Sequence, residues 1–254
     1  AMALGNKTLP DQVADYLIAR IFIGELKPGD KLPAERQLAD QLGVDRTSLR
    51  MALRHLSRLG LLRSVHGSGI TIKDYADKGG LDFLATVFSM EQLDLGGRLL
   101  LEALDQWCFF MPLLIMSASQ QREPGLIDAQ ALRGLLQMQL ALIPRKQEQL
   151  LPIVELELEL HDRLNNQVGS IIMRLINNST RILRRRIIYM LFDSIDLEQH
   201  IAYHQRLLEQ ILENSIQGHA LMDRYRAYLT NLTQELRTRL RALPPEPRLL
   251  RSPL

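Results

Sequence analysis

Four arginines at helical spacing are the most distinctive charged residues in this sequence, and together they could bind an anion. Arg46, Arg50, Arg54 and Arg58 lie four residues apart, and Asp45 is the only acidic residue between positions 45 and 63. Residues four apart share one face of a helix, so these side chains would form a basic stripe. Such a stripe suits a polyanion, and an arginine near the start of a helix in the DNA major groove can contact guanine in a bidentate manner. The stripe alone is compatible with DNA binding and equally with the solvated face of a surface helix.

The neighbouring residues supply the elements that would position this stripe. Apolar spacing predicts a helix over residues 9–23, and a second helix follows Pro33 and ends at Gly43. Asp45 is a good N-cap for the third helix, which carries the arginines and runs to Gly60. Two short β-like runs around a Gly-rich tip then predict a hairpin. Helix, turn, helix and hairpin in this order are typical of a winged helix-turn-helix.

Residues 27–69 resemble the winged-helix domain of the GntR family of transcription regulators. The text that carries the resemblance is KPGDKLPAERQLADQLGVDRTSLRMALRHLSRLGLL, followed by HGSG. The resemblance implies a DNA-binding regulator. Regulators of this kind bind symmetric operators, so we also expect a homodimer and a palindromic site in double-stranded DNA. The DNA contacts implied are Arg36, Arg46, Arg50, His66 and Gly67, with Thr47 and Ser48 as supporting contacts.

After the hairpin the pattern is almost entirely helical, which predicts a mainly α protein of two parts. The breaks in the pattern, at Pro112, Pro152 and Gly169 among others, suggest about six or seven helices in one bundle. The predicted boundaries are residues 1–73 for the winged helix-turn-helix domain, 74–82 for a linker, 83–242 for an all-helical effector-binding and dimerisation domain, and 243–254 for a Pro-rich, disordered tail.

The helical remainder is similar to the effector domain of the FadR subfamily of GntR regulators. Glu157 and His161 fall where metal-binding members place an Asp and a His, and His204 falls on another such His. The resemblance thus implies a divalent metal, zinc or nickel, held by Glu157, His161 and His204. The last histidine of the family pattern is absent, and Arg226 stands there with Tyr225 nearby. Three ligands remain instead of four.

An anionic effector, either an organic acid or an acyl-CoA, is the second expectation for the helical part. Arg98 lies in a largely apolar segment, and a guanidinium can grip a carboxylate in two places. We expect the effector near Arg98, His161 and His204, although Glu102, one turn on, could instead pair with Arg98. His200 and His204 also form an i,i+4 pair that could bind metal, which we interpret as a coincidence of spacing.

Composition limits the remaining alternatives. The chain has 254 residues, 46% of them hydrophobic and 24% charged, which is ordinary for a globular protein. The single cysteine, Cys108, makes an intrachain disulfide impossible and favours a cytoplasmic location. No uncharged apolar run approaches the roughly 18–20 residues of a membrane helix. We expect a ligand-responsive regulator and not an enzyme, with a metal-dependent hydrolase and a constitutive DNA-binding protein as the alternatives.

Overall fold

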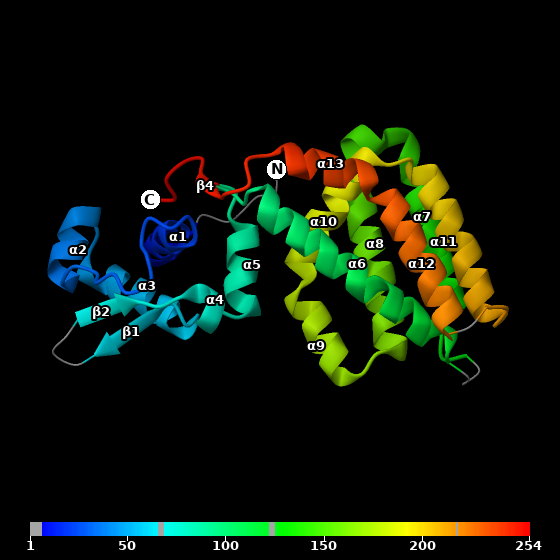
Figure 1. Cartoon of the computed structure of the whole chain (residues 1–254), viewed down its shortest axis with the longest axis horizontal. Helices are drawn as coiled ribbons and strands as arrows, with labels where there is room; N and C mark the ends of the chain where they lie inside the picture. The colour runs from blue at the N-terminus through cyan, green and yellow to red at the C-terminus, as the bar shows by residue number, and fades with distance from the viewer. Residues whose placement is uncertain (1–6, 66–68, 122–124, 217) are drawn as a thin grey trace. The chain divides into compact units, whose positions relative to one another are not determined.

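The computed structural model describes residues 7–65, 69–121, 125–216 and 218–254. It divides the chain into two compact units, each with its own core (Figure 1). The first unit holds residues up to Gly96 together with Pro244–Leu254, and the second runs from Gly97 to Leu243. Both units are built mainly from helices, as predicted, and the strands are short.

The first unit is a three-helix core with a hairpin. Its elements are α1 (Leu9–Phe22), α2 (Glu35–Leu42), α3 (Arg46–Arg58), β1 (Leu62–Val65), β2 (Gly69–Ile72), α4 (Tyr75–Lys78), α5 (Leu81–Ser89), β3 (Leu93–Asp94) and β4 (Arg248–Leu249). Helix α1 packs against α3, and Leu17, Ile18, Leu49 and Leu56 are fully buried between the helices. Because these apolar residues recur at three- and four-residue spacing, each helix turns one face inward.

The hairpin is antiparallel and is tied to the turn before α2. Leu62 pairs with Ile72 in the register of β1 and β2. On the other edge of β2, the Leu32 N–H donates to the Ile70 carbonyl and the Ile72 N–H donates to the Asp30 carbonyl. These hydrogen bonds fix the hairpin beside the helix-turn-helix, which is the arrangement the sequence predicts.

Residues 74–82, predicted as a linker, instead belong to the first unit. They form α4 and the start of α5. Tyr75 lies 5.8 Å from Phe22 and 5.0 Å from Phe83, measured between ring centroids. This cluster buries part of α5 against α1, and its members are too far apart in the sequence to be seen from local composition.

The tail after Leu243, predicted to be disordered, also belongs to the first unit. Strand β4 pairs with β3, the Leu250 N–H donates to the Gln92 carbonyl, and Arg248 forms an ion pair with Asp94 at 2.9 Å. A Cβ atom on Gly96 would lie 2.5 Å from the Pro245 carbonyl oxygen, so only glycine allows this close approach. The prediction of disorder rested on the Pro-rich composition, which does not show long-range backbone contacts.

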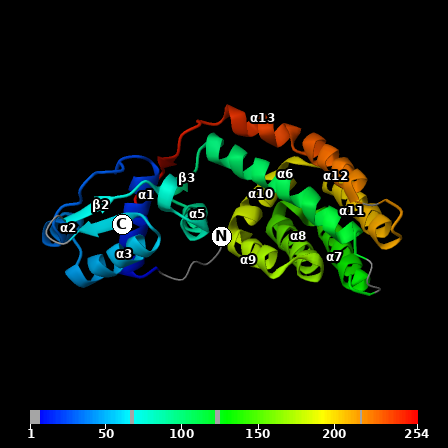
Figure 2. The ribbon, with the colours of Figure 1, turned by 60° about the horizontal axis from the view of Figure 1, so that its bottom comes forward.

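The second unit is a helical bundle (Figures 1 and 2). Both views show α6 and α12 running side by side, and α8 packs against α7 and α10. Its elements are α6 (Gly97–Ser119), α7 (Ala129–Leu142), the 3-10 turn η1 (Ile143–Arg145), α8 (Lys146–Val168), α9 (Ile171–Ser179), α10 (Arg181–Ser194), α11 (Leu197–Leu212), α12 (Gly218–Leu232) and α13 (Gln234–Ala242).

Of two prolines predicted as helix breaks, Pro112 lies inside a continuous helix, whereas Pro152 follows a kink. Pro112 sits within α6 and Pro152 within α8. A proline ring clashes with the carbonyl group four residues earlier in a regular helix. Near Pro152, α8 avoids this clash through non-helical backbone angles at Gln149. The helix then continues to Val168, which keeps Glu157 and His161 on one regular segment.

Within the part of the chain that the structure describes, α6 is the one helix long and apolar enough to cross a membrane by length and composition. Leu100, Leu104, Met111 and Ile115 of α6 are buried inside the bundle. The helix therefore also fits the role of a core helix.

Candidate nucleic-acid interface and buried histidine cluster

The outer face of α3 carries the basic stripe predicted from the sequence. Leu49, Ala52, Leu53 and Leu56 are buried on the inner face. The opposite face exposes Arg46, Thr47, Arg50, Arg54 and Arg58. The amphipathic spacing therefore both anchors the helix and presents its cations to solvent.

The first turn of α3 is held by Asp45. Its carboxylate accepts the backbone N–H of Ser48 at 2.8 Å and the Ser48 hydroxyl at 2.6 Å. The Ser48 hydroxyl, and after it the backbone N–H bonds, hold the pKa of Asp45 below its usual value. Ser48, predicted as a supporting DNA contact, thus has a capping role, while its oxygen still has acceptor capacity.

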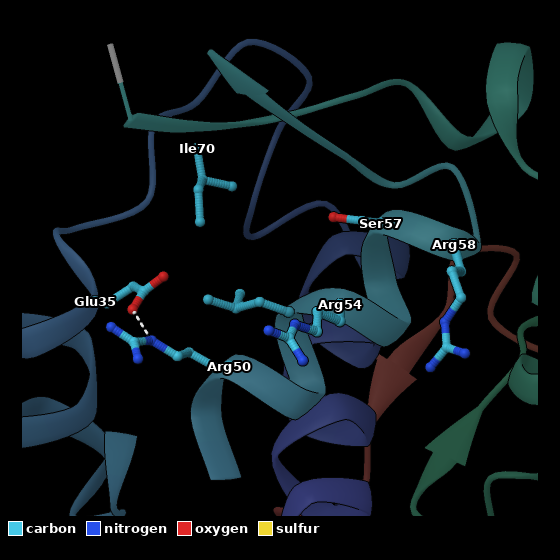
Figure 3. A pocket seen from close by; sticks show the side chains of 7 residues that line it. Glu35, Arg50, Arg54, Ser57, Arg58 and Ile70 are labelled. Atoms are coloured by element: carbon cyan, nitrogen blue, oxygen red, sulfur yellow. Dashed lines mark hydrogen bonds and ion pairs between the residues drawn. The ribbon is translucent and has the colours of Figure 1, made fainter. Parts of the chain in front are cut away.

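An open groove lies between α2, α3 and β2 (Figure 3). Arg50 is one of the residues that line it and forms an ion pair with Glu35 of α2 at 2.7 Å, drawn as a dashed line in Figure 3. Both side chains remain partly exposed, so solvent screens this pair and leaves Arg50 free to exchange Glu35 for another anion. The groove is lined by Glu35, Arg50, Leu53, Arg54, Ser57, Arg58 and Ile70.

The structure brings most of the predicted DNA contacts to one unit. Arg36 is exposed in the first turn of α2, and Arg46, Thr47 and Arg50 are exposed at the start of α3. His66 and Gly67, predicted at the tip of the hairpin, lie outside the described residues. A helix whose first turns expose arginines, with a hairpin beside it, has the geometry of proteins that insert a recognition helix into the DNA major groove.

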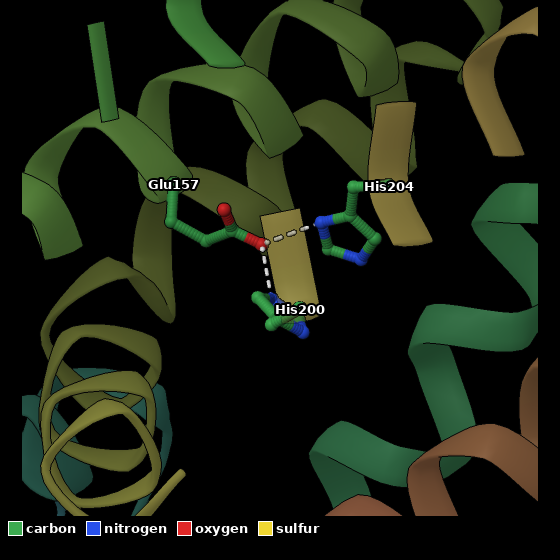
Figure 4. A group of neighbouring side chains, drawn as sticks. All are labelled: Glu157, His200 and His204. Atoms are coloured by element: carbon green, nitrogen blue, oxygen red, sulfur yellow. Dashed lines mark ion pairs between the residues drawn. The ribbon is translucent and has the colours of Figure 1, made fainter. Parts of the chain in front are cut away.

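The second unit contains a buried cluster around the Glu157 carboxylate (Figure 4). Its Oε1 atom lies 3.1 Å from His161 Nε2, 3.3 Å from His204 Nδ1 and 3.5 Å from His200 Nε2. The carboxylate comes from α8 together with His161, and the other two imidazoles come from α11. All four residues are buried.

Burial sets the charge of this cluster. It lowers the pKa of His204 to about 3, and the neighbouring His200 adds to the shift, so this imidazole is neutral at pH 7. Burial alone would raise the pKa of Glu157, but His204 and His161 outweigh it and hold that pKa well below its usual value. An ionised carboxylate beside imidazole nitrogens is a donor set that suits Zn²⁺ or Ni²⁺.

The buried nitrogen atoms test whether a metal ion fits. Both ring nitrogens of His161, Nε2 of His200 and Nδ1 of His204 have no hydrogen-bond partner within the described residues. Buried polar atoms are nearly always satisfied, so a cluster of unsatisfied ones points to a missing binding partner. The residues present therefore fit a bound divalent metal ion.

Of the three predicted effector contacts, the structure brings two together. His161 and His204 both line a small cavity of about 40 Å³ in the bundle. Arg98 is exposed in the first turn of α6, and the described residues that line this cavity do not include it. Met111, which does line it, is 13 residues farther along α6, or about 20 Å at 1.5 Å per residue.

Sequence reasoning set His200 aside and did not connect Tyr225 and Tyr228 with the histidines. The i,i+4 spacing turns both His200 and His204 toward Glu157, at 3.5 and 3.3 Å from its Oε1 atom. Tyr228 lies 2.6 Å from His200 Nδ1, and Tyr225 lies 3.1 Å from His204 Nε2. The i,i+4 spacing of the two histidines was the available signal. Tyr225 was noted beside Arg226, but its contact with His204 depends on how α12 packs against α11, which local spacing does not show.

Comparison with known proteins shows the family to which the chain belongs. Residues 9–72 match the model of the bacterial regulatory proteins of the gntR family. The chain is 32% identical over 180 residues to the HTH-type transcriptional regulator Mce2R of Mycobacterium tuberculosis, covering 69% of this chain and 70% of that protein. It belongs to the GntR family.

Two further GntR-type similarities cover different extents of the chain. A Vibrio cholerae fatty acid metabolism regulator protein is 38% identical over 76 residues, or 30% of this chain and 27% of that one. The structure of Lar, which controls the expression of the Listeria monocytogenes agr system, covers 92% of this chain and 97% of its own with a TM-score of 0.52 and 19% identity. The latter shows the fold alone.

These similarities confirm the predicted GntR-family, FadR-like regulator with an N-terminal helix-turn-helix and a helical C-terminal part. The relatives are transcriptional regulators, so the family is one of DNA-binding proteins and not of enzymes.

Proposed function

We propose that this GntR-family protein is a ligand-responsive transcription regulator that binds a palindromic operator as a homodimer. The observation that carries the proposal is the exposed face of α3, where Arg46, Thr47 and Arg50 stand beside the hairpin. An arginine at this place can contact the O6 and N7 atoms of a guanine, and Arg54 and Arg58 farther along α3 can contact phosphates.

The proposed dimer forms through the second unit. Large apolar side chains are exposed on α6 and α9. The exposed fraction is 60% for Phe109 of α6, and 62%, 61% and 54% for Ile171, Ile172 and Leu175 of α9. None of the α9 residues is buried. Three of these residues lie on α9, whose apolar side chains its own chain leaves uncovered, and a second copy of the chain is the partner that a two-fold operator requires. Light scattering should therefore give about 58 kDa, and a species of about 29 kDa at micromolar concentration would contradict the dimer.

The proposed effector is a small anion with an apolar body. The cavity beside the cluster is lined mainly by aliphatic side chains from α6, α7, α8, α11 and α12, with His161, His204 and Tyr225 as its polar members. Aliphatic walls favour an apolar body, and the imidazole and phenol groups can donate hydrogen bonds to a carboxylate. An organic acid and an acyl-CoA both meet this description.

The effector would act by shifting a population of dimer geometries. A ligand changes DNA affinity only if it binds one geometry better than the other, and the same coupling makes DNA change the affinity for the ligand. The cavity of about 40 Å³ is smaller than such a ligand, so a ligand that enters it must move the five helices that form it and can bias how they pack. The two recognition helices then match, or no longer match, the spacing of the half-sites.

The test is operator affinity with and without ligand. The full chain is titrated onto its DNA site at fixed salt, first alone and then with organic acids and acyl-CoAs that raise its melting temperature. A ligand that stabilises the protein and changes operator affinity at least fivefold is the expected result. Ligands that bind without changing operator affinity would leave a constitutive DNA-binding protein and contradict the proposal.

A further inference from the structure

Helix α3 exposes a large apolar side chain on its basic face. Met51 is 53% exposed, and among the described residues of α2 and α3 it is the one large apolar residue that solvent reaches to this extent. A single exposed apolar residue is ordinary on a protein surface. What makes Met51 informative is its position among the cations of α3.

Met51 lies on the outermost line of the helix. The inner direction of α3 is set by its four buried residues, Leu49, Ala52, Leu53 and Leu56. At about 100° per residue, Met51 lies within about 30° of the opposite direction. Thr47, Arg54 and Arg58 share this outer sector, and all three are exposed. When this face meets a polyanion, Met51 is therefore at the centre of the contact.

Met51 also lies early in the helix. It follows the first residue of α3, Arg46, by five positions, or about 7.5 Å at about 1.5 Å per residue. In helix-turn-helix proteins the N-terminal residues of the recognition helix contact base edges. Arg58, by contrast, is the last residue of α3. The position of Met51 therefore suits a contact with a base more than a contact with a distant phosphate.

The major groove has one apolar feature that a methionine can recognise. Thymine presents its C5 methyl group there, whereas adenine, guanine and cytosine present hydrogen-bond donors and acceptors. The methionine side chain is unbranched and flexible, so it can adapt to an irregular gap and lie against a methyl group. Such a contact removes apolar surface of both partners from water, which stabilises the complex.

We propose that Met51 contacts the C5 methyl group of a thymine in each half-site of the operator and so specifies a T·A base pair at that position. The inference rests on the proposed function, because it requires α3 to enter the major groove. It deepens that function by assigning a base preference to a side chain that has no N–H or O–H group. Arg46 and Arg50 can contact guanine, so the half-site should contain guanine as well as thymine.

The experiment is a scan of the thymine methyl groups in the operator. The full chain first selects its site from a pool of random duplexes, and amplification leaves thymine as the only base with a C5 methyl group. Duplexes are then made with deoxyuridine in place of thymidine at one symmetric pair of positions at a time. This change removes the methyl group and keeps every hydrogen-bonding group. In gel-shift titrations at fixed salt, one position should weaken wild-type binding about fourfold per half-site, which corresponds to the burial of about one CH₂ group.

The variant Met51→Ala tests whether Met51 makes this contact. Alanine lacks the thioether and favours a helix, so the variant should keep the fold. It should bind the thymidine and deoxyuridine duplexes with equal affinity at the sensitive position. Met51→Gln offers an amide that suits adenine, so a selection with this variant should no longer enrich thymine there.

Two controls separate this contact from general effects. Met138 is 55% exposed on α7 of the second unit, so Met138→Ala removes an equally exposed methionine and should keep the wild-type sensitivity to deoxyuridine. Arg50→Ala should weaken binding to the thymidine and deoxyuridine duplexes by the same factor. Circular dichroism of every variant checks the fold.

Three results would overturn the inference. Wild-type binding that is insensitive to deoxyuridine at every position would remove the methyl contact. The same sensitivity in Met51→Ala as in the wild type would assign the contact to another residue, and selected half-sites without thymine would leave Met51 no base to contact. Each of these results leaves operator binding intact, whereas an unenriched pool would overturn the proposed function and this inference with it.

Discussion

Helix α3 and the Glu157 cluster both depend on charged or titratable side chains, yet the fold treats them in opposite ways. The Arg50 side chain is 54% exposed and the Glu157 side chain 2%. An exposed charge stays hydrated and is available to a large polyanion, whereas a buried charge must be paired where it lies. The first arrangement suits a DNA surface, and the second suits a small, specific partner.

The two regions also differ in how far apart their residues lie in the sequence. Arg46 and Arg50 belong to one helix, whose inner face is anchored by residues of the same segment. The cluster needs α8, α11 and α12 to meet before any of its distances exists. DNA affinity should therefore respond mainly to mutations in α3. The geometry of the cluster should respond to mutations that disturb the packing of any helix in the bundle.

The largest expected effect tests whether the units have separate cores. Leu158 is fully buried in α8, one residue after Glu157. Leu158→Ala should lower the free energy of unfolding of the second unit by about 2–5 kcal/mol, because it removes buried apolar contacts and leaves a cavity. Hydrogen exchange resolved by segment should show faster exchange in α7, α8 and α11. Equally faster exchange in α1 and α3 would contradict separate cores, and Leu56→Ala is the matched variant in the first unit.

The next effect isolates the DNA-reading face. Arg46→Ala and Arg50→Ala should each weaken binding to the operator by roughly 1–3 kcal/mol, since each removes a contact to a base or phosphate. Gel-shift titration at fixed salt measures the change. Arg98→Ala, which removes an exposed cation from the second unit, is the control. Unchanged operator affinity in both α3 variants would remove this face from the interface.

A smaller effect concerns the support of that face. Asp45→Ala removes the two hydrogen bonds that cap α3 and should cost about 1 kcal/mol of stability in the first unit. Thermal unfolding followed by circular dichroism should show the loss, and Asp45→Asn should restore most of it. If Asp45→Ala were as stable as the wild type, the cap would contribute nothing to the position of Arg46.

The smallest effect separates Arg98 from the effector cavity. Arg98→Ala should leave the melting-temperature shift caused by a bound organic acid or acyl-CoA unchanged, because Met111 and Ile115 are the α6 residues that line the cavity. His204→Gln should reduce that shift. A ligand that loses its effect in Arg98→Ala and keeps it in His204→Gln would restore the role that the sequence predicts for Arg98.

The sequence predicted the first region well and the second only in part, for a physical reason. Periodicity and capping residues reveal an amphipathic helix, so the bounds of α3 and its exposed arginines followed from Asp45, Gly60 and the four-residue spacing. Glu157 and His161 followed from the resemblance to the FadR subfamily, and the structure places both on α8. The contact between Tyr228 and His200 depends on how α12 packs, and the pairing of the tail with β3 depends on backbone groups, which no local pattern encodes.

The central claim is that α3 reads a two-fold symmetric operator, and selection of binding sites from a pool of random duplexes tests it most directly. The full chain is incubated with the pool at fixed salt, and bound duplexes are amplified and sequenced. The account predicts an inverted repeat, with enrichment lost in the Arg46→Ala, Arg50→Ala double variant. An unenriched pool, or the same repeat selected equally well by the double variant, would contradict it.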